Sequence, residues 1–191
     1  MALRSFLAFN LPVEIKNKIA QISGVLKRSS IDARWVKADN IHLTIVFLGD
    51  IRQEDLIPMR KEIRDVCTQN QAFEISLRGI GLFPNRRRPR VIWLGLDGEL
   101  EEMSGFRDEL QGRLVSFGIK AENRGFQPHI TLGRFRKPDR IDSDQSGILS
   151  GYEELQGPAG QLNELIMFRS ELKPGGAVYS VIDSWPLSSS S

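Results

Sequence analysis

Two short segments of the sequence repeat one pattern, histidine–apolar–threonine–apolar, at residues 42–45 and 129–132. Polar and apolar residues alternate in both segments, which is the two-residue period of a strand with one buried face. The sequence contains 2 histidines, so the repeated pattern uses both of them. We therefore predict two equivalent strands that each present one imidazole and one hydroxyl on the same face: His42 with Thr44, and His129 with Thr131.

The regions around the motifs are related by the same shift of 87 residues that separates the two histidines. This shift lays the apolar segment 6–9 over 93–96. It also lays the helix expected after Pro12 over the helix expected near residues 100–114, and each helix has an apolar face. The order strand, helix, His-x-Thr strand therefore occurs twice at one offset, which duplication or structural pseudo-symmetry explains better than coincidence.

Apolar periodicity and turn residues predict the remaining elements. We expect strands at residues 4–10, 73–83 and 91–96, a helix from about 53 to 68, a loop at 137–150, and two closing strands at 161–172 and 177–185. Gly79 and Gly81 lie in one of these strands without the rest of a dinucleotide-binding fingerprint. Helices and strands mix and the chain ends in a hairpin, so the expected class is α+β with mainly antiparallel sheets.

The bulk properties are those of an ordinary soluble globular protein, with 40% hydrophobic and 26% charged residues. We expect residues 1–191 to form a single domain of two closely packed, duplicated lobes. The net charge of +2 is too small for a general nucleic-acid coat, so affinity for anions must be local. One cysteine excludes an internal disulfide and fits a reducing cytosol, and neither a signal peptide nor a membrane span is evident, so we expect a cytoplasmic protein.

The two histidines and two threonines suit phosphodiester chemistry if their strands face each other. Imidazole titrates near neutral pH, so a facing pair can supply one general acid and one general base. The hydroxyls can donate hydrogen bonds to an anion between them. A single histidine on a strand is more often structural, but two copies that use all the histidine of the chain favour function. A metal site is the weaker alternative, because zinc takes three or four protein ligands and Cys67 fits the core of a predicted helix better.

Both His-x-Thr motifs, with their flanking residues, match a known pattern, and so do shorter segments elsewhere in the chain. The matching segments are residues 4–9, Trp35, 40–50, 83–84, 88–95, 126–134 and 171–179. On these segments the sequence resembles the two-histidine phosphoesterase superfamily, and within it the bacterial and archaeal RNA 2',3'-cyclic phosphodiesterases, historically called 2'-5' RNA ligases. The resemblance covers nearly the whole chain and includes all four motif residues.

The resemblance implies a bilobal α+β fold with two pseudo-symmetric halves, antiparallel sheets flanked by helices, and an active-site groove between the lobes. It implies hydrolysis of a 2',3'-cyclic phosphate at an RNA end to a 2'-phosphate without metal or cofactor, with reversible 2'-5' ligation in some members. His42 would donate a proton to the departing 3'-oxygen, and His129 would accept one from water. Thr44 and Thr131 would bind the non-bridging oxygens. Symmetry alone does not decide which histidine is the base.

Arginines near the motifs are further candidates for binding phosphate. The resemblance implies that Arg134 lies near the reacting phosphate, but strict alternation places it on the opposite strand face from His129, so this role requires a strand end or a bulge. The turn at residues 84–90 is the densest basic patch and is either simply solvated or holds RNA phosphates. Its basic residues are Arg86, Arg87, Arg88 and Arg90. Phe9, Phe47 and Tyr179 could stack on bases, although core packing is the expected position of each.

The expected partner is RNA with a 2',3'-cyclic phosphate end, tRNA-like fragments among them. We expect a monomer without an obligate protein partner. The same chemistry would also suit small cyclic nucleotides, ADP-ribose cyclic phosphate or 2'-5' oligonucleotides. A catalytically silent RNA-binding module is the alternative from another class, and the intact histidine and threonine pairs argue against it.

Overall fold

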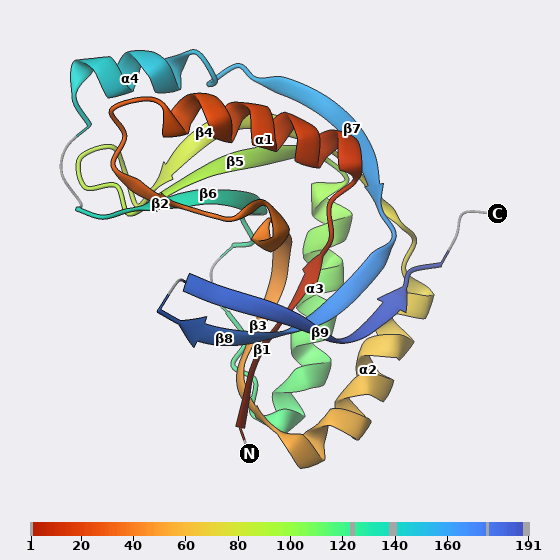
Figure 1. Cartoon of the computed structure of the whole chain (residues 1–191). Helices are drawn as coiled ribbons and strands as arrows, with labels where there is room; N and C mark the ends of the chain where they lie inside the picture. Colours follow the sequence, from red (N-terminus) through yellow and green to blue (C-terminus); the bar gives the residue numbers. More distant parts are fainter. Residues whose placement is uncertain (1, 123–124, 138–140, 175, 189–191) are drawn as a thin grey trace.

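A computed structural model describes residues 2–122, 125–137, 141–174 and 176–188. These residues form two antiparallel sheets (Figure 1). The first sheet has the order β3-β1-β8-β9, with β3 at Leu43–Arg52, β1 at Ala2–Phe9, β8 at Glu164–Lys173 and β9 at Gly176–Pro186. The second has the order β2-β6-β5-β4-β7, with β2 at Ala33–Trp35, β6 at His129–Phe135, β5 at Val91–Gly98, β4 at Phe73–Phe83 and β7 at Gln156–Leu162.

The α-helices of the described residues cover these sheets: α1 (Val13–Lys27), α2 (Leu56–Gln69), α3 (Leu100–Leu114) and α4 (Ser143–Ser150). Helix α1 follows β1 of the first sheet but packs on the second, as Figure 1 shows. A side chain at Gly160 of β7 would lie 2.7 Å from Pro12, so the contact there is close. Helix α3 follows β5 of the second sheet but contacts β3 of the first. The two lobes thus exchange helices.

The pseudo-symmetry predicted from the sequence is present in the fold. Shifted by 87 residues, α1 coincides with α3 and β3 overlaps β6. In the second sheet β6, β5, β4 and β7 take the places of β3, β1, β8 and β9 in the first. The two His-x-Thr strands, β3 and β6, contact each other where the sheets meet. The predicted bilobal α+β class with antiparallel sheets is therefore confirmed.

The alternation predicted for the two motifs is also present. Leu43 and Ile130 are fully buried, while the histidine and threonine beside each of them are half-buried. Burial of one such side chain stabilises the fold by roughly 1.5–3 kcal/mol, so a one-residue slip of either strand would be costly. Phe9 is fully buried, as expected.

Two local expectations were wrong, and one short strand was missed. The predicted loop at residues 137–150 contains α4, which begins with a capping box between Asp142 and Gln145; residues 138–140 lie outside the described part. The predicted strand at 161–172 is two strands, because the chain passes from β7 to β8 at Asn163 and changes sheet there. The short strand β2 was not predicted.

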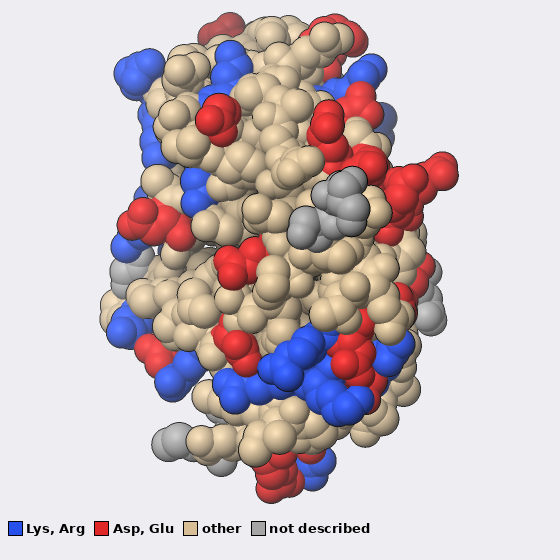
Figure 2. Space-filling view, turned by 90° about the vertical axis from the view of Figure 1, so that its right-hand side faces the viewer, with Lys and Arg blue, Asp and Glu red and all other residues tan. Residues whose placement is uncertain are grey.

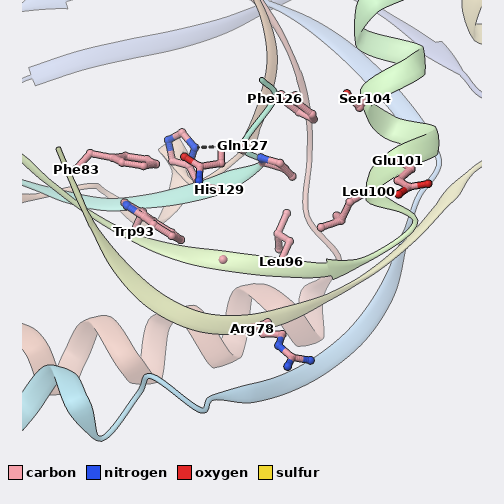
Figure 3. Close-up of a pocket in the computed structure, with 12 residues that line it drawn as sticks. Arg78, Phe83, Trp93, Leu96, Leu100, Glu101, Ser104, Phe126, Gln127 and His129 are labelled. Atoms are coloured by element: carbon pink, nitrogen blue, oxygen red, sulfur yellow. Dashed lines mark hydrogen bonds between the residues drawn. The ribbon is translucent and has the colours of Figure 1, made fainter. Parts of the chain in front are cut away.

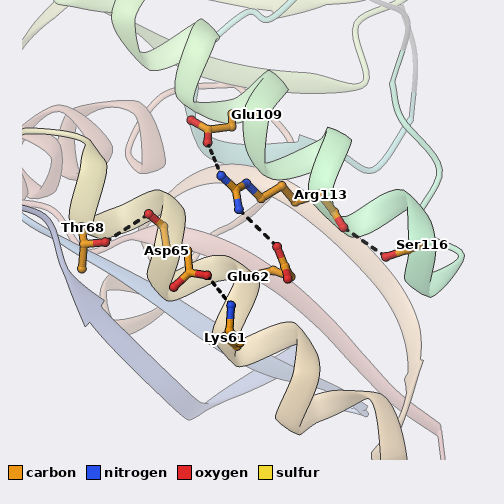
Figure 4. Close-up of polar contacts among 7 residues, drawn as sticks. All are labelled: Lys61, Glu62, Asp65, Thr68, Glu109, Arg113 and Ser116. Carbon is orange, nitrogen blue, oxygen red and sulfur yellow. Dashed lines mark hydrogen bonds and ion pairs between the residues drawn. The ribbon is translucent and has the colours of Figure 1, made fainter.

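Polar contacts connect α2 to α3 on one side of the molecule. The Arg113 guanidinium donates to Glu62 at 3.3 Å and to Glu109 at 3.1 Å, and Lys61 pairs with Asp65 at 2.7 Å (Figure 4). Figure 2 shows the molecule from the side on which α2 lies, with acidic groups beside the basic ones. Exposed pairs of this kind contribute little stability. Within the described ranges, no helix is both long and apolar enough to cross a membrane.

Candidate active site

His42 stands directly before β3, and its orientation is fixed by a backbone acceptor. Its Nδ1 atom lies 2.7 Å from the carbonyl oxygen of Asn40. A carbonyl oxygen can only accept a hydrogen bond, so Nδ1 carries the hydrogen and Nε2 remains free. The Asn40 side chain in turn donates to the carbonyl oxygen of Ala177 in β9, at 2.8 Å. The residue that binds the imidazole is therefore itself tied to β9 of the first sheet.

Aromatic side chains surround the His42 ring. The ring centroids of Phe6, Tyr179 and Phe168 lie 4.8, 5.3 and 6.1 Å from that of the imidazole. Burial lowers the pKa of His42, and its bond to the Asn40 carbonyl offsets this only in part. The neutral imidazole is thus favoured in the free protein. Tyr179 is half-buried against His42 at this site, so its expected core position was wrong.

His129 repeats the same arrangement in the second sheet. Its Nδ1 atom lies 2.8 Å from the carbonyl oxygen of Gln127, again two residues before the histidine, so Nε2 is again free (Figure 3). The rings of Phe83 and Trp93 meet the imidazole edge-on, with centroids 5.0 and 6.1 Å away. Figure 3 shows all three rings on the sheet face turned away from α1.

A glycine explains how Trp93 lies flat on this sheet. The indole stacks on Phe83 with ring centroids 4.8 Å apart, and it covers Gly81 of β4. A side chain at Gly81 would collide with the indole ring. The absence of a side chain at Gly81, which lies in a Gly-x-Gly segment without an assigned role, therefore makes room for Trp93 at the site.

Each His-x-Thr strand contains a β-bulge directly after its threonine. In β6, Thr131 lies opposite Trp93 and Gly133 lies opposite Ile92, so Leu132 is an extra residue. The pairing of β3 with β1 shifts at the equivalent place. Because residues opposite each other in an antiparallel pair share a face, each bulge changes the face of every later residue in its strand.

The bulge in β6 moves Arg134 to the face of the catalytic candidates. Arg134 lies opposite Val91, which shares the face of Trp93 two residues later in β5. On its other side Arg134 lies opposite Arg34 of β2, and both arginines are exposed. Arg34 therefore also belongs to this face, although no pattern in the sequence indicated it. A pair of opposed cations beside Thr131 is a suitable site for an anion.

The bulge in β3 acts in the same way on Phe47. This residue lies opposite Phe6, on the face that carries His42, and its side chain is 65% exposed. The expectation that Phe47 packs in the core was wrong. The shift of 87 residues places Phe47 over Arg134, so the two halves have an aromatic ring and a cation at equivalent positions.

The basic turn leads directly out of the site, because it follows Phe83. The Asn85 side chain accepts hydrogen bonds from the backbone N–H groups of Arg87 and Arg88, at 2.9 and 3.1 Å. Arg86 pairs with Glu153 beyond α4. Arg87 and Arg88 are exposed and make no ion pair within the described residues, so their side chains remain available to a ligand.

Cys67 does not take part in this site. It is fully buried, and burial raises the pKa of its thiol to about 12, so it stays protonated at neutral pH. Among the residues that the structure describes, no three His, Cys, Asp or Glu side chains gather in a way that could hold a metal ion.

Comparison with known proteins gives the family. The model of the LigT like Phosphoesterase family matches residues 9–93 and again residues 94–179, and the chain belongs to this family. Its relatives include proteins named RNA 2',3'-cyclic phosphodiesterase from Methanothermobacter thermautotrophicus, 31% identical over 98% of this chain and 100% of the relative, and from Methanocaldococcus jannaschii, 33% identical over 96% and 100%. The crystal structure of TT0787 from Thermus thermophilus has a TM-score of 0.77 and 28% identity, over 97% of this chain and 98% of that one.

Proposed function

We propose that this protein hydrolyses the 2',3'-cyclic phosphodiester at the end of an RNA chain to a 2'-phosphate. The observation that carries the proposal is the pair of histidines whose Nδ1 atoms are both bound by a carbonyl two residues earlier. Each imidazole therefore offers one free nitrogen, Nε2, for proton transfer. The names of the relatives support the substrate class.

The family resemblance supplies the direction of proton transfer. His129 accepts a proton from the attacking water through Nε2, and His42 donates a proton to the departing 3'-oxygen. The aromatic surroundings of His42 make its imidazolium a stronger acid, and the anionic substrate beside it favours the protonated form when bound. Thr44 and Thr131 donate hydrogen bonds to the non-bridging oxygens. No step requires a metal ion, since imidazoles and hydroxyls supply proton transfer and charge stabilisation.

We assign the binding of substrate phosphate to Arg134 and Arg34. Both are exposed on the face of Thr131, and their opposed positions allow two guanidinium groups to donate to one anion. Arg87 and Arg88, which follow Phe83 in the basic turn, would bind phosphates further along an RNA chain. This second group of cations favours RNA over a free cyclic nucleotide as the substrate.

An oligoribonucleotide with a 2',3'-cyclic end, incubated with the protein in EDTA, tests the reaction. Product with the phosphate on the 2'-oxygen is expected. A 3'-phosphate would reverse the leaving-group assignment, and loss of activity that a divalent ion restores would disprove the metal-free mechanism. His42→Ala and His129→Ala should each lower turnover at least ~10²-fold, and the double variant should lose much less than the product of the two.

A substrate with sulfur in place of the bridging 3'-oxygen shows which histidine is the general acid and which is the general base. A thiolate leaves without protonation, so the proposed acid is not needed with this substrate. His42→Ala should regain most of its activity on it, whereas His129→Ala should not. Recovery by His129→Ala alone would exchange the two roles.

A further inference from the structure

The segment that leads into β6 has no regular secondary structure and depends on tertiary contacts for its position. Residues 118–122 and 125–128 lie outside helices and strands. The end of this segment orients His129, because the Gln127 carbonyl oxygen accepts the hydrogen bond from Nδ1 of the imidazole. The next residue, Pro128, restricts Gln127 to extended backbone conformations. A displacement of Phe126 is therefore passed on to the carbonyl that orients the imidazole.

Phe126 lies between α3 and Gln127 (Figure 3). It borders a cavity of about 510 Å³ that Gln127 and His129 also line. A side chain at the edge of a cavity lacks packing partners on that side, so the cavity does not restrain the ring. On the side of α3, the Arg107 guanidinium lies 5.2 Å from the ring centroid, within the range of a cation–π contact. The position of the ring therefore depends on contacts such as the one with Arg107.

Arg107 also holds the beginning of this segment. Its guanidinium donates to the carbonyl oxygen of Glu122 at 3.3 Å and to the Glu122 carboxylate at 3.4 Å, and it pairs with Asp108 at 3.2 Å. One turn later in α3, the buried Gln111 side chain accepts a hydrogen bond from the backbone N–H of Glu122 at 3.3 Å. Arg107 is only 4% exposed, whereas both carboxylates are exposed. Exposed partners at these distances offset little of the desolvation cost of a buried cation, so stability alone does not explain the charge at this position.

The first half of the sequence has neither the cation nor the ring at the equivalent positions. The shift of 87 residues lays Ala20 over Arg107 and Asp39 over Phe126. The histidine of that half is oriented instead through a side chain that is bound to β9. Of the two histidines, the one that acts as the base in the proposed mechanism is thus the one connected to a buried cation.

We infer that Arg107 is a positioning residue for His129. Its guanidinium holds Phe126, and through Phe126 it holds the Gln127 carbonyl, which keeps the hydrogen of the neutral imidazole on Nδ1 and leaves Nε2 free. The inference rests on the proposed function, in which Nε2 of His129 accepts the proton of the attacking water. Because Arg107 acts through the imidazole and is itself buried, its removal should lower kcat and leave KM nearly unchanged.

The nitrogen chemical shifts of the imidazoles test this inference without substrate. The chain contains 2 histidines, so isotope-labelled histidine gives two sets of ring signals, and the spectrum of His42→Ala identifies the set of His129. Spectra are recorded at about pH 8.5, where imidazole is ordinarily neutral. In the unmodified protein both rings should carry the hydrogen on Nδ1. Arg107→Met should move His129 toward a mixture of the two tautomers and leave His42 unchanged.

Steady-state hydrolysis of a nucleoside 2',3'-cyclic phosphate is the second measurement. Arg107→Met should lower kcat by about 2- to 30-fold, which corresponds to the strength of a cation–π contact, and change KM by less than about two-fold. Methionine replaces the buried cation with an apolar side chain of similar length, so the variant should remain folded. Arg107→Lys keeps a cation near the ring and should recover part of kcat and of the Nδ1 tautomer. Arg113→Met, at an ion-paired and partly exposed arginine of the same helix, is the matched control and should change none of these values.

A double-mutant cycle tests the route through Phe126. Phe126→Leu keeps an apolar side chain but removes the ring, so it should shift the His129 tautomer even if Arg107→Met does not fold. The double variant should lose no more kcat than the more damaging single variant, whereas losses that multiply would contradict the route through Phe126. An unchanged His129 tautomer in folded Arg107→Met would overturn the inference. Absence of hydrolysis in the unmodified protein would instead contradict the proposed function, and the tautomer measurement would still decide whether Arg107 positions His129.

Discussion

Removal of Arg34 should raise the stability of the protein and lower its activity at the same time. Arg34 and Arg134 lie directly opposite each other on β2 and β6, and both are exposed. Like charges in this position destabilise a sheet, on the scale of the roughly 0.2–1 kcal/mol measured for cross-strand pairs. Salt screens exposed groups, so the lower end of this range applies. At about 2–4 °C per kcal/mol for a chain of this length, Arg34→Ala should therefore raise Tm by up to about 1 °C, and less at high salt.

The same substitution removes a charged donor from the substrate phosphate. A hydrogen bond to a charged group contributes roughly 1.5–3 kcal/mol, which corresponds to a fall of about 10- to 150-fold in kcat/KM. Arg134→Ala should behave in the same way. The double variant should gain no more stability than either single variant, because the first substitution already removes the repulsion between the two.

Steady-state hydrolysis of a nucleoside 2',3'-cyclic phosphate and thermal unfolding at two salt concentrations measure the two effects. Arg136→Ala is the matched control, because Arg136 follows β6 but is paired with Asp32 at 3.3 Å. Its loss should give no gain in Tm and nearly unchanged turnover. A lower Tm in Arg34→Ala, or an unchanged kcat/KM, would refute the proposal that the two arginines share a substrate anion.

Three further predictions concern pH, packing and RNA length. Burial lowers the pKa of His42 in the folded protein, so the unfolded chain binds the proton more readily. The contribution of the neutral imidazole to stability is therefore complete above the ordinary pKa of 6.5 and is lost as pH falls through the folded pKa. Urea unfolding of His42→Ala should lack this pH dependence. Gly81→Ala should cost about 1–3 kcal/mol of unfolding free energy by collision with the indole above it, whereas Gly105→Ala, in open space on α3, should stabilise slightly. Combined Arg87→Ala and Arg88→Ala should raise KM for an RNA oligomer and reduce its salt slope by about 0.7 per lost phosphate contact, but leave a cyclic mononucleotide unaffected.

Most of the regular elements could be predicted from the sequence because their signals are local. Strand β4 spans Phe73–Phe83, the predicted range, and α1 and α3 follow the predicted apolar faces. The half-buried histidines and threonines follow from the two-residue period of a strand. The capping box at Asp142 and Gln145 was also a local signal for α4, although the polar composition around it suggested a loop.

The features that could not be predicted from the sequence depend on contacts between distant segments. Nothing near Asn163 indicates that β7 and β8 belong to different sheets, because no proline or glycine separates them. The position of Arg34 depends on its pairing with a strand far along the chain. The extra residue Leu132 is an ordinary leucine, so the bulge that moves Arg134 to the site face had no sequence signal. Local propensity does not encode such pairing, since the register of distant strands is a tertiary property.

The duplicated halves hold different residues at equivalent positions, and in the proposed mechanism these differences matter more than the symmetry. The shift that lays His42 over His129 also lays Phe6 over Trp93 and Phe47 over Arg134. Both halves place aromatic rings around the imidazole, but one half has the exposed Phe47 ring where the other has the Arg134 cation. Two identical halves would bind a phosphodiester equally well in either direction. In the proposed mechanism the half with Phe47 instead favours the ribose and the half with Arg134 favours the phosphate, so only one imidazole meets the leaving oxygen and the other is left to the attacking one.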